Sequence, residues 1–514
     1  MGVNVKTILV LNMGMKSIRS IIFDTKGSKL ASSFMPIETS LRGETVTQLP
    51  SEWWEKASIV IRETLADAGD IHIDYLTVTS SSSCLVCVDK DGKALMPCMM
   101  VSDKRAREES GYIEGLAAFA EATKQAGCSL GPSFMLPKAL WVKVHEKEIY
   151  NKTFKLLAPN DYLIAKFTGQ FVTDYMNAHK WYYDEQKKQY PSQLLKEIGI
   201  SEQLLPEVAA PGSYIGMITE SAARHTGLSR ETKVILSTYD AICSFVGSGV
   251  VHEGEASDVS GTVTVFRAAS SKRLDNIGSR IQQQPYYEGG LHIIGGSNNM
   301  GGGLIEWVKQ CYYQNETLPY ELMEKDAGEA SLGAGGVIFL PYLLGERAPL
   351  WDSDARGVFF GLERMHTRKE MTRAVFESTG FIDLDMIAAI EETGLKIDTI
   401  RLSGGLARVN LVSQIKADIT GRQIQVLSEF ETTATGAAMM ALYGQGVYAS
   451  LDEAAKSFVR VRMIITPDSR NHEKYKELYY LYKETYHTLK PLFVKRMAIT
   501  DRLYSKKRIR IENL

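Results

Sequence analysis

Short apolar runs alternate with amphipathic helical stretches along most of the chain, a pattern typical of an α/β protein. Near the start, residues 8–11 and 18–23 read as two strands of a meander, with turns at 13–16 and 24–27. Ser51 is then expected to cap a helix that Gly69 ends. We expect strands and helices to keep alternating after this helix.

The middle of the chain repeats the opening pattern. Residues 233–237 read as a strand that ends at Tyr239–Asp240, and strands at 257–260 and 263–266 are joined by Gly261–Thr262. A strand, a glycine turn and a second strand therefore open each half of the chain, which indicates a weak internal repeat. We expect two domains of related design, residues 1–249 and 250–514, with a hinge at the glycines between them: Gly247, Gly249 and Gly254.

Further elements are predicted in the second half. Strands are expected at 291–294, 337–340 and 400–403, and a helix from Leu304. Thr367 and Glu370 have the spacing of a capping box at the start of another helix. From about Asn471 the chain reads as an amphipathic helix with a basic tail at 506–510, for which a solvated face is favoured over a binding patch.

Composition narrows the function classes. A chain of 514 residues exceeds what one core supports, so two domains of about 250 residues are expected. The formal net charge of −2 favours neither nucleic acid nor a membrane surface as partner. The N-terminus lacks a secretory pattern, and no run of about 18 apolar residues suggests a membrane span.

The cysteines suggest a cytoplasmic protein. Cys84 and Cys87 have the spacing of half a zinc site, but no second pair or nearby histidine completes it. Buried reduced thiols are the favoured interpretation, and they predict the cytoplasm as location.

Glycines directly after strands are the most informative local feature. They occur at Gly14, Gly261, the run 301–303, and Gly404–Gly405. A glycine there lets backbone N–H groups approach a phosphate, and a following helix adds its positive end. Each turn alone is more typical of a plain tight turn. Together, in two similar halves, they predict a nucleotide held from both sides.

Two aspartates are candidates for substrate chemistry. Asp240 follows a predicted strand, where a carboxylate could accept the proton of an attacking hydroxyl. It could equally cap the next helix. Asp103 could bind substrate hydroxyls or pair with Arg105 or Arg107.

The loop 345–352, GERAPLWD, mixes opposed charges with Pro and Trp. We interpret it as a structural loop fixed by ion pairing rather than a substrate contact. The nine histidines show no metal-ligand spacing, and no GxSxG motif supports hydrolase chemistry.

Several segments, in this order, resemble the FGGY family of carbohydrate kinases. The strongest are GERAPLWDSDARGVFFGL at 345–362 and LSGGLARVNLVSQIKADITG at 402–421, supported by ETTATGAA at 431–438 and VDKDGKALMP at 88–97. The resemblance implies two ribonuclease-H-like domains of the actin and hexokinase type flanking a nucleotide cleft. It also implies transfer of a phosphoryl group from ATP, with Mg²⁺, to a small sugar or polyol, and homodimers or tetramers as assemblies.

The resemblance assigns roles to particular positions. Asp240 matches the family's catalytic base, which also approaches the metal. The positions that match nucleotide contacts are Gly14, Lys16, Ser17, Arg19, Gly261, Thr262, Gly302, Glu306, Gly404 and Gly405. The positions that match the substrate side are Ser82, Ser83, Asp103, Asp240 and Ala241.

Some positions depart from the family pattern. The first motif normally reads Asp-x-Gly-Thr, whereas this chain has Asn12 and Met15. The missing carboxylate normally helps to hold the water shell of Mg²⁺, so Asn12 should bind the metal more weakly through water. Val101 stands where Trp is usual, and 81–83 are serines where xylulose kinases have Gln-Met-His.

Two hypotheses follow, and a third is disfavoured. The chain is an active kinase for a ketose, polyol or sugar acid, with the Asp-Ala pair at 240–241 most similar to the xylulose kinase branch. Alternatively, it is a catalytically impaired member that binds nucleotide or sugar as a regulator, because of Asn12 and Met15. A filament or chaperone-type ATPase of the same superfamily is disfavoured by the segments at 345–362 and 402–421.

Overall fold

The chain folds into two compact units. The computed structural model describes residues 6–126, 131, 133–274, 280–285, 291–429 and 431–511. Unit 1 combines the chain up to Gly249 with the segment Thr432–Val459, and unit 2 combines most of Val250–Glu431 with Arg460 onward. The sequence-based division put Thr432–Val459 in the second half, whereas its contacts place it in unit 1.

The sheet of unit 1 has six strands in the order β12-β13-β6-β1-β2-β3. The central strands β13, β6 and β1 are parallel to one another, and the remaining neighbours pair antiparallel. The bounds are β1 (Thr7–Met13), β2 (Ser17–Asp24), β3 (Lys29–Pro36), β6 (Tyr75–Ser80), β12 (Tyr214–Met217) and β13 (Lys233–Ile235). The predicted meander at the N-terminus is confirmed.

The sheet of unit 2 repeats this plan. Its order is β16-β17-β15-β14-β20-β21-β22, with β14, β20 and β21 parallel and the other neighbours antiparallel. The bounds are β14 (Glu255–Ser260), β15 (Thr264–Ser270), β16 (Gln282–Pro285), β17 (His292–Ser297), β20 (Thr399–Ser403), β21 (Gln423–Leu427) and β22 (Val461–Ile465). Apart from β16, strand order and direction match those of unit 1, so the internal repeat is confirmed.

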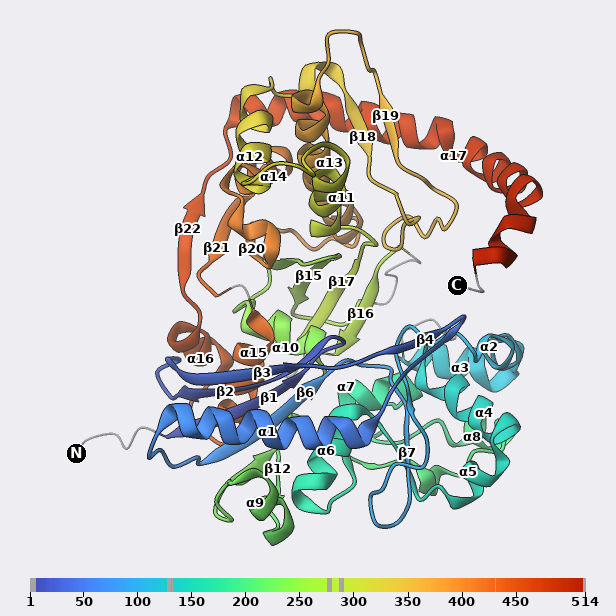
Figure 1. Ribbon diagram of the computed structural model, residues 1–514, viewed down its shortest axis with the longest axis vertical. Coiled ribbons are helices and arrows are strands. Elements are labelled where there is room, and N and C mark those ends of the chain that lie inside the picture. The colour runs from blue at the N-terminus through green and yellow to red at the C-terminus, as the bar shows by residue number, and fades with distance from the viewer. Residues whose placement is uncertain are drawn as a thin grey trace. The chain divides into compact units, whose positions relative to one another are not determined.

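Helix α1 (Pro50–Ala68) packs on β2 and β3 in unit 1 (Figure 1). It begins at Pro50, so the expected Ser51 cap was wrong: the preset φ of proline suits the first helical position. Gly69 ends it with φ 75°, as predicted. The other helices of this unit are α2 (Arg107–Glu114), α3 (Ala117–Ala126), α4 (Met135–His145), α5 (Lys147–Lys152), α6 (Pro159–Thr168), α7 (Tyr175–Ala178), α8 (Ser192–Ile198), α9 (Glu220–Thr226), α10 (Asp240–Gly247), α15 (Thr432–Gly444) and α16 (Leu451–Phe458).

Helices α10 and α15 cross at two glycines. A Cβ on Gly247 would lie 1.9 Å from the Thr432 carbonyl oxygen, and one on Gly436 would lie 1.8 Å from that of Cys243. Gly247 is therefore a helix contact that needs the absence of a side chain. The hinge expected at Gly247, Gly249 and Gly254 stays a prediction, and the boundary between the two units falls within this stretch. This contact explains why Thr432–Val459 belongs to unit 1.

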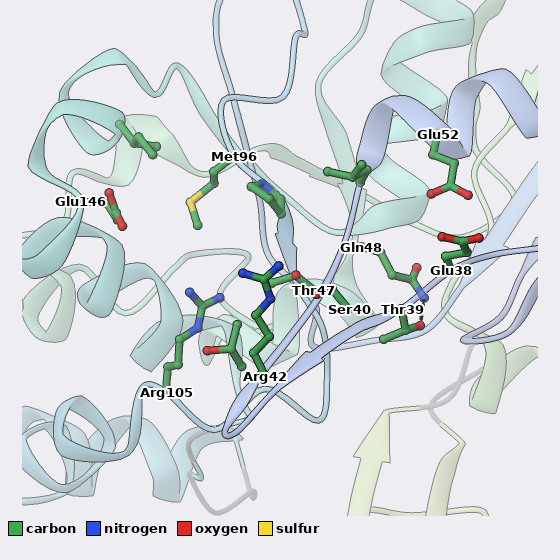
Figure 2. A pocket seen from close by; sticks show the side chains of 14 residues that line it. Glu38, Thr39, Ser40, Arg42, Thr47, Gln48, Glu52, Met96, Arg105 and Glu146 are labelled. Atoms are coloured by element: carbon green, nitrogen blue, oxygen red, sulfur yellow. Dashed lines mark hydrogen bonds between the residues drawn. The ribbon is translucent and has the colours of Figure 1, made fainter. Parts of the chain in front are cut away.

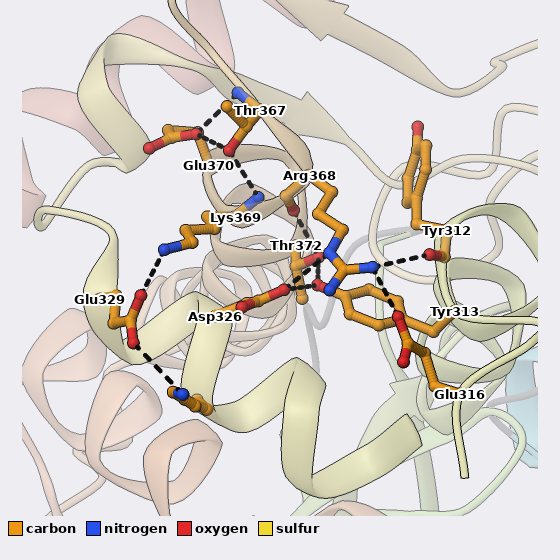
Figure 3. Close-up of polar contacts among 11 residues, drawn as sticks. Tyr312, Tyr313, Glu316, Asp326, Glu329, Thr367, Arg368, Lys369, Glu370 and Thr372 are labelled. Atoms are coloured by element: carbon orange, nitrogen blue, oxygen red, sulfur yellow. Dashed lines mark hydrogen bonds and ion pairs between the residues drawn. The ribbon is translucent and has the colours of Figure 1, made fainter. Parts of the chain in front are cut away.

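Helix α13 (Arg368–Glu391) forms the long central helix of unit 2. Its predicted capping box is confirmed, with Glu370 accepting from the Thr367 backbone N–H at 2.8 Å. Figure 3 shows Arg368 at its start, which pairs with Asp326 of α12 (Pro319–Glu329) and with Glu316, each at 2.9 Å. The remaining helices of unit 2 are α11 (Gly302–Tyr312), α14 (Asn410–Thr420) and α17 (Ser469–Ile511).

Helix α17 begins two residues before the predicted start at Asn471 and is drawn in red in Figure 1. Its Tyr475 and Tyr482 are buried against Phe381 of α13. The side chains of the basic tail at 506–510 lie outside the described residues.

Short strands complete the two units. They pair as β4 (Ser40–Arg42) with β5 (Thr45–Gln48) and β8 (Cys98–Met99), β7 (Val86–Val88) with β9 (Lys155–Leu157), β10 (Val172–Asp174) with β11 (Glu207–Ala209), and β18 (Ile338–Leu340) with β19 (Val358–Phe360).

The cysteines carry no disulfide in the described parts of the chain. Cys84 and Cys87 are buried free thiols, as predicted, and burial raises the pKa of Cys87 to about 12. Cys128 lies outside the described residues. Among the helices that the structure describes, none combines the length and apolar character that a membrane crossing requires.

Candidate active site

In unit 1, three parallel strands end at one edge of the sheet. Asn12 and Met13 at the end of β1 pair with Thr79 and Ser80 at the end of β6, and β13 pairs with β6 on its other side. Carboxyl ends of parallel strands are where open α/β sheets form ligand sites. The segments that leave this edge are 14–16, 81–83 and 236–240.

Asp240 is the first residue of α10, and Tyr239 occupies the cap position. The alternative that Asp240 caps this helix is therefore wrong. Its carboxylate accepts a hydrogen bond from Ser81 Oγ at 3.2 Å, which links the end of β6 to the start of α10. Asp240 and Ala241 are both partly exposed. This carboxylate stands at the sheet edge beside the serine segment.

The serine segment is held by a buried lysine that the sequence analysis missed. Ser83 has φ 59°, and its carbonyl accepts a hydrogen bond of 2.7 Å from Lys138 Nζ, which also donates to the Met100 carbonyl at 2.7 Å. Lys138 is 0% exposed, and burial lowers its pKa. Its position in the otherwise apolar stretch 135–142 was the available signal.

Asp103 is 0% exposed. Its carboxylate accepts hydrogen bonds from Arg105 Nε and Nη2, the latter at 3.0 Å, and from the Val46 backbone N–H at 2.9 Å. Arg107 instead pairs with Glu44 at 2.8 Å. The structure shows the pair of Asp103 with Arg105, and the binding of substrate hydroxyls by Asp103 stays a prediction.

The turn between β1 and β2 holds the first predicted phosphate motif. The Gly14 N–H donates to the Ser17 carbonyl at 2.9 Å, and a Cβ on Gly14 would meet nothing closer than 3.8 Å. Lys16 is exposed, and Arg19 lies over the Phe34 ring. Asn12 is 9% exposed at the base of this turn.

In unit 2, three glycine turns predicted from the sequence lie against one another. The Gly302 N–H donates to the Gly261 carbonyl at 2.7 Å, and the N–H groups of Gly301 and Gly303 donate to the Thr262 carbonyl at 3.0 and 3.1 Å. Gly404 has φ 86°, and a Cβ there would lie 2.5 Å from the Ser260 carbonyl. Unit 2 thus gathers the backbone of the turns 261–262, 301–303 and 404–405, with the start of α11 among them.

A buried charge cluster lies directly beneath these turns. Lys416 Nζ contacts Asp258, Asp383 Oδ2 at 2.7 Å and Ser260 Oγ at 3.2 Å. Lys416 and both aspartates are at most 1% exposed. Burial, together with the nearby Asp258, raises the pKa of Asp383 well above its usual range. Because Ser260 precedes Gly261, this cluster fixes the strand end from which the turn starts.

The loop 345–352 is bonded to Asn298 and Asn299, which come just before the glycine run 301–303. Glu346 is buried and accepts hydrogen bonds from the backbone N–H of Asn299 at 2.8 Å and of Arg347 at 2.7 Å. Asn298 Nδ2 donates to the Ala348 carbonyl at 2.8 Å. The structural interpretation of this loop agrees with these contacts, but backbone donors hold Glu346 where ion pairing was expected. Burial raises the pKa of Glu346 to about 7.

Comparison with known proteins decides the family. The model of the FGGY family of carbohydrate kinases matches in both its parts, the N-terminal domain over residues 7–247 and the C-terminal domain over residues 257–444. The chain belongs to the FGGY family of carbohydrate kinases. The family that the sequence motifs resembled is thereby confirmed.

Relatives of this FGGY kinase include enzymes for two kinds of sugar. The xylulose kinase of Bacillus subtilis is 27% identical over 95% of this chain and 98% of its own length. The gluconokinase of the same organism is 24% identical over 97% of both chains. Among solved structures, the gluconate kinase and the ligand-bound xylulose kinase of Lactobacillus acidophilus each match with a TM-score of 0.88, at 25% and 26% identity. These matches cover 96% and 95% of this chain, and 100% and 99% of theirs.

Glu306 of this FGGY kinase lies on α11, close after the glycine run. Its exposed carboxylate pairs with Lys309 at 2.8 Å and accepts a hydrogen bond from the Tyr320 hydroxyl. The hydrogen bond from Lys309 lowers the pKa of Glu306, so this side chain is an anion with two partners at the helix surface.

The nucleotide donor of FGGY kinases is ATP. In the described part of the chain, no group of three or more His, Cys, Asp or Glu side chains could hold a metal ion. Mg²⁺ commonly uses one or two protein carboxylates together with substrate phosphates, so the residues present fit a metal that arrives with the nucleotide.

Proposed function

We propose that this chain is an ATP-dependent kinase that phosphorylates a hydroxyl of a small ketose, polyol or sugar acid, with Asp240 as general base. The observation that carries the proposal is the Ser81–Asp240 hydrogen bond at the strand-end edge of unit 1. It supports a fixed carboxylate at a position open to a ligand. The names of the relatives, xylulose and gluconate kinases, support this substrate class.

In the proposed reaction, Asp240 accepts the proton of the attacking hydroxyl while Ser81 keeps its carboxylate oriented. Ser82, Ser83 and Ala241 border the sugar. Asp103 lies on the substrate side, as the family pattern assigns it, with its carboxylate paired to Arg105. These assignments leave room for a substrate, since all three bordering side chains are small.

In this proposal the nucleotide lies against the backbone of the glycine turns. Gly261–Thr262, Gly302 and Gly404–Gly405 approach the ATP in unit 2, and Glu306 lies nearby on α11. Gly14, Lys16, Ser17 and Arg19 approach the transferred phosphate from the first turn. Mg²⁺ would neutralise charge on the phosphates, with Asp240 and, through water, Asn12 as its protein neighbours.

The direct test is an ADP-release screen of the purified chain over pentuloses, hexuloses, polyols and aldonates at several Mg²⁺ concentrations. The proposal predicts that one substrate group stimulates ADP formation well above the rate without sugar. Stimulation by none of them would contradict it.

A second candidate is an impaired family member that binds nucleotide or sugar as a regulator, favoured by Asn12 and Met15 in the first turn. Restoring the family residues with Asn12→Asp and Met15→Thr discriminates the two. An active kinase should show robust turnover before these changes. A regulator should bind nucleotide without turnover. Turnover should then appear only in the double variant, or in neither protein. A cytoplasmic location and a homodimer complete the proposal.

A further inference from the structure

Unit 1 contains a cavity at the β4–β5 hairpin, and its lining does not include Asp240 or the serine segment. It has a volume of about 730 Å³ and is lined by the hairpin, the start of α1, the segment 96–97, Arg105 and the residues Glu146 and Ile149. A volume of this size suits a small metabolite, since ligand sites commonly span about 300–1,000 Å³.

Figure 2 shows that the charges in this hairpin pocket are separated. The Arg42 and Arg105 side chains lie at one end with Thr47, and the Glu38 and Glu52 carboxylates face each other at the other end. Glu146 lies apart from both groups. Lys56 pairs with Glu52 and so offsets part of the negative charge at that end.

The Arg105 guanidinium is preorganised for an anion. Its Nε and Nη2 are held by Asp103, and its Cζ lies 4.6 Å from the centroid of the Trp141 ring. Its Nη1 donates to no described residue. Arg42 is exposed and forms no hydrogen bond or ion pair with the residues that the structure describes. Two guanidiniums at one end, one of them fixed, match a phosphate or carboxylate.

The opposite end suits hydroxyl groups. Carboxylates accept hydrogen bonds from sugar hydroxyls, and the Thr39 hydroxyl adds a further polar atom along the wall. A ligand that satisfies both ends carries one anionic group and several hydroxyls.

The wall of the pocket is bonded to the first phosphate turn. Gln48 Nε2 donates to the Met15 carbonyl at 2.9 Å and to Thr39 Oγ1 at 2.9 Å, and Thr39 Oγ1 lies 3.4 Å from the same carbonyl. Gln48 is 2% exposed and also accepts from the Trp53 indole at 2.9 Å. A ligand that contacts Thr39 would therefore shift or fix the Met15 carbonyl, because Thr39 and Gln48 are bonded to each other and to that carbonyl.

We propose that the hairpin pocket is a second ligand site, which takes a polyhydroxylated compound with one anionic group, a sugar phosphate or a sugar acid, and which adjusts the turn 13–17 through Thr39 and Gln48. The choice of a sugar phosphate as ligand rests on the proposed function, because a kinase of this class releases such a compound. The site is thus suited to feedback by product-like molecules.

Calorimetric titration of the full chain tests the site with four probes: ribose 5-phosphate, gluconate, ribose and inorganic phosphate. The proposal predicts that ribose 5-phosphate or gluconate binds, and that Arg42→Ala weakens this binding about 10-fold or more. Arg230→Ala, which removes another exposed arginine of unit 1, should bind as the unchanged chain does. Asp240→Ala should also leave this binding unchanged, because the probe occupies a different site.

Three results would overturn the site: no binding of either anionic sugar, binding that Arg42→Ala does not affect, or equal binding of inorganic phosphate alone. The titrations need no turnover. A chain that phosphorylates no sugar but binds a probe through Arg42 would contradict the proposed function and support this site.

Hydrogen exchange tests the link to the phosphate turn. The bound probe should slow amide exchange in residues 13–17 of the unchanged chain, and Thr39→Val should abolish that effect while the probe still binds. Unaltered exchange in the unchanged chain with the probe bound would overturn the coupling.

Discussion

Ser81 Oγ donates a hydrogen bond of 3.2 Å to Asp240 Oδ2, and so joins two residues that are 159 positions apart in the sequence. The parallel strands β6 and β13 bring them together by ending at the same sheet edge. The candidate base is therefore oriented by a second segment of unit 1.

Ser81→Ala should lower kcat about 5-fold, because a hydrogen bond of this kind contributes about 1 kcal/mol to the orientation of the carboxylate. Steady-state kinetics with the best sugar from the screen measures this. Ser32→Ala, an exposed serine of β3, serves as the control and should not change kcat. An unchanged kcat in Ser81→Ala would argue against the role of this hydrogen bond.

The adjacent glycines Gly404 and Gly405 should respond differently to alanine. Gly404→Ala combines positive φ with a clash against the Ser260 carbonyl, and should lower the free energy of unfolding by about 2 kcal/mol or more. A Cβ on Gly405 meets only that same oxygen, at 4.0 Å, so Gly405→Ala should leave stability unchanged.

If nucleotide approaches this backbone, Gly405→Ala should weaken ATP binding about 5- to 30-fold, equal to about 1–2 kcal/mol. Chemical denaturation and ATP titration measure the two effects. Full ATP affinity in Gly405→Ala would place the nucleotide elsewhere.

Much of the fold followed from local sequence signals. The meander at 8–23, the capping box at Thr367 and the glycine after α1 are encoded by neighbouring residues, and each was predicted. The helix contact of Gly247 was not predicted, because the atoms that exclude a side chain there belong to the distant helix α15. The assignment of 432–459 to unit 1 depends on the same long-range contact.

The candidate site shows the same division. Sequence motifs located the glycine turns and Asp240. Glycine is needed where two backbone segments approach closely, and Asp240 directly follows a predicted strand. Lys138, Lys416 and Asp383 were missed, since each looks like an ordinary polar residue of a helix until the fold buries it. The sequence also could not show which arginine pairs with the Asp103 carboxylate, which in the structure is Arg105.

Lys416→Met should destabilise the chain by about 3–5 kcal/mol, because it leaves two buried carboxylates without their cation. Denaturant unfolding measures the loss. Lys396→Met, at an exposed lysine of unit 2, is the matched control. It should lower the free energy of unfolding by less than about 0.5 kcal/mol. Equal stability of the two variants would contradict the importance of the buried cluster.

Glu346 predicts a pH dependence of stability. Its pKa is about 7 in the folded chain and 4.5 in its ordinary state, so between these values the folded chain holds more protons than the unfolded one. This group's contribution to stability is therefore present below about pH 4.5 and is lost as the pH rises toward 7.

Glu346→Gln removes this titration, so the stability of the unchanged chain should fall relative to the variant by an amount on the order of 3 kcal/mol between pH 4.5 and 7. Denaturant unfolding of both proteins over this range measures the difference, in which the other titrating groups cancel. Parallel stability curves would show that Glu346 titrates normally.

The central claim is that Asp240 removes the proton of the sugar hydroxyl. Comparison of kcat between the unchanged chain and Asp240→Asn, at saturating ATP and sugar, tests it most directly. The account predicts a loss of about 10²- to 10⁴-fold in kcat with ATP affinity retained, because the amide keeps the shape but cannot accept the proton. A kcat within about 3-fold of the unchanged chain would contradict it, since so small a loss is far below what a general base contributes.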